Sequence, residues 1–184
     1  MKHGRRPVNI EEERRRAERA RAEHRIADAA RHLSNVADAL RSSKDRAALA
    51  HTLRDLGELE RGMSADAARI HYEEATSILR ELDTPLTLAH TIRHLGDIHT
   101  KAGRLSLAEQ CCEEAVAIYH AQSDASALDV ANAIRSLAVV KERLAQMDQA
   151  RQLWQDAHSR YAALNVDEGT AEAAAHLGRL TRNR

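Results

Sequence analysis

Three side chains that could bind a metal ion recur at helical spacing in the middle of the chain, as His90-x3-His94-x2-Asp97. Residues three and four apart share one face of an α-helix, so two imidazoles and a carboxylate could point at one cation. A single helical turn rarely completes a zinc site, and no glutamate–histidine signature of a metalloprotease accompanies this one. The chain has 11 histidines, so close pairs are expected by chance. We therefore predict no metal site.

Paired carboxylates at Glu73-Glu74 and Glu113-Glu114 could serve acid–base chemistry. Each pair lies beside an alanine of a helical pattern, which predicts that the carboxylates are solvated on an outer helix face. The sequence has neither a glycine-rich phosphate loop nor a nucleophile elbow, and its Ser, His and Asp residues are scattered. We therefore expect no enzymatic activity and no cofactor.

Composition indicates a globular protein that is helical almost throughout. The 28 basic and 28 acidic residues cancel, which argues against a protein built to coat nucleic acid or an anionic membrane. Only seven Gly and two Pro interrupt a sequence rich in Ala, Leu, Arg and Glu, which are good helix formers. Cys111 and Cys112 are adjacent, a spacing that forms no zinc site or disulfide framework and that fits reduced thiols. We therefore expect a cytoplasmic location and no membrane span.

A nine-residue motif organises the chain. Its copies end on a small residue at Gly57, Gly96 and Ala138, with a weaker copy at Gly178, so the periods are 39, 42 and 40 residues. An alanine lies seven residues before each of these positions. Self-similarity at a fixed period is the signature of a repeat architecture. We expect the small residues to allow close helix packing, because Gly inside a helix otherwise costs about 1 kcal/mol.

A second motif follows each of the first three copies. It reads Ala68-x3-Tyr72-x2-Ala75, Ala108-x3-Cys112-x2-Ala115 and Ala150-x3-Trp154-x2-Ala157, and its last alanine falls 18, 19 and 19 residues after the small residue. Two motifs in constant register predict a helix hairpin in each repeat. We predict hairpins over 45–82, 85–121 and 125–164, followed by a capping helix over 168–182.

This pair of motifs resembles the tetratricopeptide repeat family, in the longer variant of about 40 residues found in kinesin light chains. The matching residues are Leu53, Leu56, Gly57, Gly62, Ala68, Tyr72 and Ala75; Ile92, Leu95, Gly96, Gly103, Ala108, Cys112 and Ala115; and Ile134, Leu137, Ala138, Ala150, Trp154 and Ala157. The third copy departs from the pattern because Ala138 replaces Gly and no turn Gly follows. The resemblance implies an all-α, right-handed α-solenoid of antiparallel helix hairpins.

In that family the first helices line the concave surface, where ligands usually bind. The residues opposite the apolar stripe of each first helix would then line a groove: His51, Arg54, Glu58, Arg61, His90, Arg93, Asp97, Lys101, Asn132, Arg135 and Arg143. Arg54, Arg93 and Arg135 recur in register and could grip carboxylates. The alternative is that Arg is simply a common surface residue in an Arg-rich chain.

Residues 1–44 fit the repeat less well. We expect a disordered tip over 1–8 and one long charged helix over 10–42, because no Gly or Pro interrupts residues 8–56. Ala30-x3-Ser34-x2-Ala37 echoes the second motif, so a degenerate preceding repeat is the alternative. The acidic residues of this segment offset much of its Arg charge, which argues against a nucleic-acid arm.

The function that this architecture implies is protein–protein interaction. The concave groove would bind a peptide or partner protein, one that is acidic or has a free C-terminal carboxylate. The alternative is a structural protein that assembles with further copies of itself through the groove or the 10–42 helix.

Overall fold

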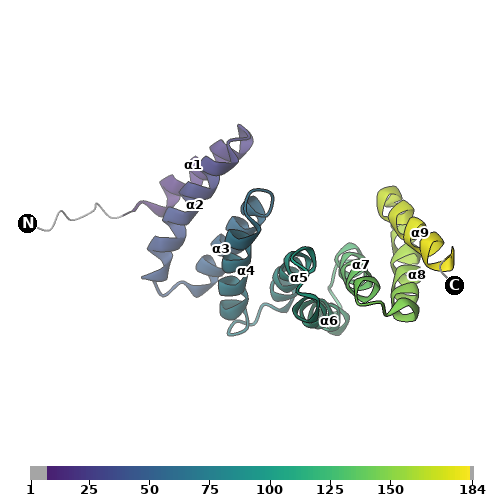
Figure 1. Ribbon diagram of the computed structural model, residues 1–184. Helices are drawn as coiled ribbons and strands as arrows, with labels where there is room; N and C mark the ends of the chain where they lie inside the picture. Colours follow the sequence, from purple (N-terminus) through teal and green to yellow (C-terminus); the bar gives the residue numbers. More distant parts are fainter. Residues whose placement is uncertain (1–7, 183–184) are drawn as a thin grey trace, which may run out of the picture. The chain divides into compact units, whose positions relative to one another are not determined.

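The computed structural model describes residues 8–182, and within them every regular element is an α-helix (Figure 1). This confirms the all-α repeat fold; the tip expected over 1–8 lies almost wholly outside the described residues. The helices are α1 (Ile10–Ala22), α2 (Ile26–Arg41), α3 (Arg46–Glu60), α4 (Ala65–Leu79), α5 (Pro85–Lys101), α6 (Leu105–Ala121), α7 (Ala127–Arg143), α8 (Met147–Ala163) and α9 (Asp167–Arg182). None of the described helices is both long and apolar enough to cross a membrane.

The described part of the chain forms two compact units, which divide between Asp83 and Thr84. Within each unit, consecutive helices pack against one another, from α1 to α4 and from α5 to α9. The boundary differs from the expected division at residue 44, because α2 packs on α3 with a buried apolar face of Ala29, Val36 and Leu40. The N-terminal segment is thus part of the first unit.

Four connections between helices use the same three-residue turn, whose middle residue has a left-handed backbone. In the α5–α6 turn this residue is Gly103 (φ 73°), and in the α7–α8 turn it is Ala145 (φ 60°). The amide of the left-handed residue donates to the carbonyl three residues before it, and the next amide donates to the carbonyl five residues before it. These are the bonds of a Schellman motif, which ends a helix by satisfying its last carbonyls. The third repeat keeps the turn although it lacks the glycine.

The expectation of one long helix over 10–42 is wrong. The helix stops after Ala22, and His24 takes the left-handed conformation (φ 57°) with the same two backbone bonds. His is among the non-glycine residues that tolerate this conformation. The reason for the break is packing, since folding back buries Ala17 and Ala20 of α1 in a hairpin with α2.

The α1–α2 hairpin keeps the register of the other repeats. Counted from the left-handed residue, Ala17 stands where Gly96 stands, and Ala29 and Val36 stand where Ala108 and Ala115 stand. All six residues are buried. The motif at Ala30, Ser34 and Ala37 therefore lies one residue too late. The structure thus has a hairpin of repeat type before the three that the sequence predicts.

The close-packing role of two glycines is confirmed. A Cβ atom at Gly96 would lie 2.7 Å from the Cys112 sulfur, and one at Gly57 would lie 2.9 Å from ring atoms of Tyr72. At Gly178 the nearest atom would be 3.8 Å away, so this glycine has room for a side chain. Gly57 and Gly96 therefore lie at close helix contacts, whereas Gly178 of the capping helix α9 does not.

Candidate functional site

The eleven groove candidates all belong to first helices or their ends, as expected. His51, Arg54, Glu58 and Arg61 belong to α3 or its C-terminal cap; His90, Arg93, Asp97 and Lys101 to α5; and Asn132, Arg135 and Arg143 to α7. They are divided between the two units, so each set is described within its own unit.

In the N-terminal unit, charged candidates pair with each other or with near neighbours. Arg54 lies 3.0 Å from Asp55, and Arg61 lies 2.9 Å from Glu58. The Tyr72 hydroxyl donates to the second oxygen of Glu58 at 3.0 Å. Glu58 is therefore held from two sides, and Arg54 already has a carboxylate partner.

A pocket of about 160 Å³ in the same unit lies between α1, α2 and α3. Its lining residues are Arg14, Ala17, Glu18, Arg21, Leu33, Asp55 and Leu59, none of which belongs to the predicted groove. The sequence pattern missed these residues because it treated α1 as part of a longer solvated helix.

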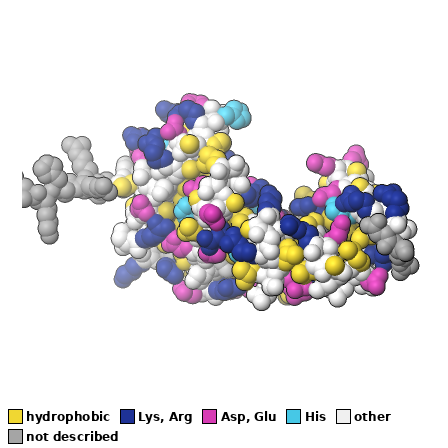
Figure 2. Space-filling view, viewed as in Figure 1, with side chains coloured by type: hydrophobic (Ala, Val, Ile, Leu, Met, Phe, Trp, Pro, Cys, Tyr) yellow, Lys and Arg dark blue, Asp and Glu magenta, His cyan; other side chains and the backbone are white. Residues whose placement is uncertain are grey.

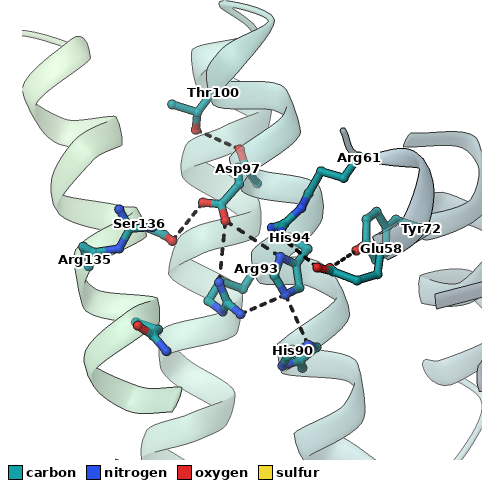
Figure 3. Close-up of polar contacts among 12 residues, drawn as sticks. Glu58, Arg61, Tyr72, His90, Arg93, His94, Asp97, Thr100, Arg135 and Ser136 are labelled. Atoms are coloured by element: carbon teal, nitrogen blue, oxygen red, sulfur yellow. Dashed lines mark hydrogen bonds and ion pairs between the residues drawn. The ribbon is translucent and has the colours of Figure 1, made fainter. Parts of the chain in front are cut away.

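In the C-terminal unit, Asp97 joins α5 to α7. The Ser136 hydroxyl donates to one oxygen of Asp97 at 2.8 Å, and the Arg93 guanidinium lies 3.6 Å from the other (Figure 3). Ser136 is a partner that sequence reasoning missed; it follows Arg135 in the first motif and is buried. Because this serine hydrogen-bonds the carboxylate and not a histidine, the arrangement lacks the order of a nucleophilic triad.

The two histidines of the metal-like motif also serve this network. The Nε2 atom of His94 lies 2.9 Å from an Arg93 nitrogen and 3.1 Å from Nε2 of His90. Arginine can only donate, so Nε2 of His94 must be an acceptor, and its proton sits on Nδ1, which is 3.9 Å from Asp97. The lone pair that a metal would need is thus directed at Arg93. Among the described residues no group of three or more side chains could hold a metal ion.

Arg93, which the sequence pattern places opposite the apolar stripe of its helix, is buried. Its relative exposure is 7%, and its Nε atom is buried without a hydrogen-bond partner. The side chains of Arg54 and Arg135 are 30% and 29% exposed. Arg93 is enclosed because its helix packs against both α6 and α7. The three arginines share a repeat position but not an environment.

Arg135 connects α7 to the capping helix. Its guanidinium donates to Glu172 of α9 at 3.0 Å. Burial disfavours the charge on Arg135, but Glu172 and Asp97 outweigh it, so the pKa of Arg135 is raised. Beside this pair, the Tyr161 hydroxyl donates to Asn132 at 2.8 Å. Together with Asp97 and Ser136, these contacts link the first helices α5, α7 and α9.

A second link to α9 centres on Glu142, whose Oε2 atom lies 2.6 Å from Nδ1 of His176 and accepts from the Trp154 indole at 3.1 Å. The rings of His176 and Trp154 stack with centroids 4.0 Å apart. Near the same end of α7, Arg143 donates to the Thr100 carbonyl of α5 at 2.6 Å. The polar face of α7 is therefore tied to both neighbouring first helices.

The solvated interpretation of the two glutamate pairs holds only in part. Glu73 is exposed and pairs with Arg69 of its own helix at 2.7 Å. Glu113 is half-exposed, but it accepts a 2.7 Å hydrogen bond from the buried Lys141 of α7. Glu74 accepts two hydrogen bonds from Arg41 of α2. Glu74 and Glu113 therefore connect helices, which local spacing could not reveal.

Comparison with solved structures finds similar helical repeat proteins. The chain is similar to the TPR-like repeats of a kinesin light chain from Podospora anserina, at 14% identity, covering 99% of this chain and 88% of that chain, with a TM-score of 0.74. It is similar to a signal transduction ATPase with a tetratricopeptide repeat sensor from Pyrococcus horikoshii (16% identity, 91% and 26% covered, TM-score 0.79). It is also similar to a Rap protein complexed with competence and sporulation factor (14% identity, 90% and 46% covered, TM-score 0.70).

The chain thus spans about a quarter of the ATPase and under half of the Rap protein. No protein-family model and no curated protein matches the sequence. At sequence identities near 15%, the similarity shows the fold alone, and the function depends on the residues of the site. The hairpins, their two motifs in register and these similarities together show that the chain has the TPR-like helical repeat fold.

Proposed function

We propose that this protein is an interaction module, and that the first-helix face of its C-terminal unit binds a peptide segment of a partner protein. This face is formed by α5, α7 and α9 and carries His90, Asp97, Asn132, Arg135 and Glu172. The observation that supports it most directly is the Arg135–Glu172 pair, whose side chains are 29% and 38% exposed. A ligand can therefore reach both charges.

Preorganisation supports the same proposal. Asp97 is held by Ser136 and Asn132 by Tyr161, so polar groups on different helices have fixed positions before a ligand arrives. Groups that are already ordered lose less entropy on binding. The Rap protein with its bound factor shows that a similar fold can hold a ligand, although its low identity carries no residue to this chain.

The ligand that suits this face has a carboxylate. A peptide carboxylate could compete with Glu172 for Arg135, because a guanidinium can donate two parallel hydrogen bonds to one carboxylate. Arg93 then acts by positioning Asp97 and His94, since it is buried and directed at both. Arg54 offers a comparable half-exposed guanidinium in the N-terminal unit.

The test uses a library of random peptides synthesised with either free or amidated C-termini, with fluorescence polarisation as the readout. Arg135→Ala should weaken the selected peptides by about tenfold, as expected for losing one charged hydrogen-bonded partner. Arg31→Ala, which removes an exposed ion pair on the second helix α2, is the matched control and should change little. Added salt should weaken binding to the wild type.

Two results would count against this face. One is a set of peptides that bind the Arg135→Ala variant as tightly as the wild type. The other is affinity that does not depend on salt or on any acidic group of the peptide.

A further inference from the structure

The C-terminal unit also has a groove of about 430 Å³ that does not lie on the first-helix face. This groove lies between the second helices α6 and α8. We call it the second-helix groove. Its floor is Leu137 and Lys141 of α7; Glu113 of α6 forms one wall, and Gln149, Gln152 and Leu153 of α8 form the other. Its volume is within the range of about 300–1,000 Å³ that ligand sites occupy. The polar links of the first-helix face do not involve these residues.

The N-terminal unit shows why this groove is open. There the corresponding helices α2 and α4 are joined by Arg41, which donates to both oxygens of Glu74 at 2.9 and 2.7 Å. In the repeat register, His120 stands at the position of Arg41 and Asp156 at that of Glu74. Asp156 pairs instead with Arg160 of its own helix, at 2.8 Å. The bridge between second helices is therefore replaced by a pair within α8.

The groove has more negative than positive charge. Lys141 is only 7% exposed and lies 2.6 Å from Glu109 and 2.7 Å from Glu113. One ammonium faces two carboxylates, which leaves one net negative charge. The Glu113 side chain is 51% exposed, so this excess charge is accessible to a ligand. Burial disfavours a charged Lys141, but its hydrogen bonds to the two glutamates outweigh this and raise its pKa.

The groove also offers apolar contact and backbone hydrogen-bonding partners. Leu153 is only partly buried and packs on a core cluster that contains Leu137 and Val140. Gln149 and Gln152 are exposed and can each both donate to and accept from a peptide backbone. Figure 2 shows hydrophobic side chains reaching the surface of the C-terminal helices beside acidic ones.

We propose that the second-helix groove docks a peptide segment of a partner protein in which a large apolar residue adjoins an arginine or lysine. The apolar side chain packs on Leu137 and Leu153, and the cation approaches Glu113. Complementary charge selects this partner, because an acidic segment or a nucleic-acid phosphate would face the excess negative charge. The site is independent of the first-helix face, so either can fail alone.

The experiment selects 12-residue peptides from a phage-displayed library against the full chain and measures their Kd by fluorescence polarisation. One selected class should carry an apolar residue beside Arg or Lys. Glu113→Lys should weaken that class by at least about tenfold, since it turns an attraction into a repulsion. Glu73→Lys is the matched control, because Glu73 occupies the same repeat position on α4, and its effect should stay within about twofold.

Glu113→Lys places two ammonium groups together, so a second variant guards against a local folding defect. Gln152→Glu adds a carboxylate at an exposed wall position and should tighten the same peptides by about threefold. A loss of folding could not produce this gain. Circular dichroism melts of each variant provide the folding check.

The proposal is overturned if no selected class responds to Glu113→Lys, or if every binder depends on Arg135 instead. The proposal is also overturned if the Gln152→Glu variant binds the basic peptides no more tightly than the wild type. If the chain self-associates and Glu113→Lys abolishes this association, the occupant of the groove is a second copy of the chain and not a partner peptide.

Discussion

Residues at equivalent positions of successive repeats have different surroundings in this fold and therefore different chemistry. Arg54, Arg93 and Arg135 align in sequence, yet the first pairs with its neighbour, the second is buried beside His94, and the third reaches α9. The neighbours of a repeat position decide its role. Repeat alignment therefore predicts location better than it predicts function.

Gly96 gives a sharp test at this scale. Gly96→Ala should lower the free energy of unfolding by about 1–3 kcal/mol, because the added Cβ would lie 2.7 Å from the Cys112 sulfur and overpack the hairpin. The larger Gly96→Leu should be worse. Gly178→Ala on α9 is the control, since its Cβ meets nothing closer than 3.8 Å, and it should gain up to about 1 kcal/mol of helix propensity. Urea denaturation measures the free energy of unfolding of both variants. Equal changes in Gly96→Ala and Gly178→Ala would show that Gly96 is not needed for close helix packing.

Tyr119 predicts the behaviour of the protein in alkali. Burial raises the pKa of Tyr119 to about 12, and its hydroxyl is buried without a hydrogen-bond partner. Between the tyrosine pKa of about 10 in the unfolded chain and the folded value, the unfolded state loses a proton that the folded state keeps. Stability is therefore full below pH 10 and should fall as the pH rises toward 12.

Tyr119→Phe should reduce this alkaline loss without costing stability at pH 7, because the substitution removes an unsatisfied buried group. Thermal melts at pH 7, 10 and 11 compare it with the wild type. A variant that loses stability in alkali as steeply as the wild type would show that Tyr119 is not the group responsible.

At the scale of elements, the shared turn makes a paired prediction. Ala145 has φ 60° where Gly103 has φ 73°. Ala145→Gly should stabilise the third repeat by about 0.5–1 kcal/mol, because glycine relieves the left-handed strain but adds unfolded-state entropy. Gly103→Ala should destabilise the second repeat by about 1 kcal/mol for the opposite reason. Urea denaturation measures both changes in the free energy of unfolding. Changes of opposite sign would support a shared left-handed turn, and changes of the same sign would contradict it.

For the whole molecule, contacts between neighbouring repeats imply that damage at one end stays local. Deletion of residues 167–184 removes His176 from the only tryptophan, Trp154, and exposes its ring. The fluorescence emission should shift to the red, and α7 and α8 should lose at least about 2 kcal/mol of protection from hydrogen exchange, as expected for losing buried side chains such as Leu180. Exchange in α3 and α4 should not change; a uniform loss would mean that the chain unfolds as one unit.

The repeated motifs by themselves predicted the hairpins within residues 45–164 and the capping helix, because each motif holds its apolar spacing within one or two helical turns. They also located the groove candidates on first helices. Glycine at 57 and 96 pointed to close helix contacts for the same local reason, since its cost inside a helix demands compensation.

Tertiary structure alone decided the rest. Nothing local stops the helix at Ala22: the break at His24 exists because folding back buries Ala17 and Ala20 against α2. The burial of Arg93 and the pairing of Lys141 with Glu113 likewise depend on side chains from helices about 30 to 40 residues apart in the chain. Spacing along one helix reports which residues share a face, whereas the partner that meets the face is set by packing.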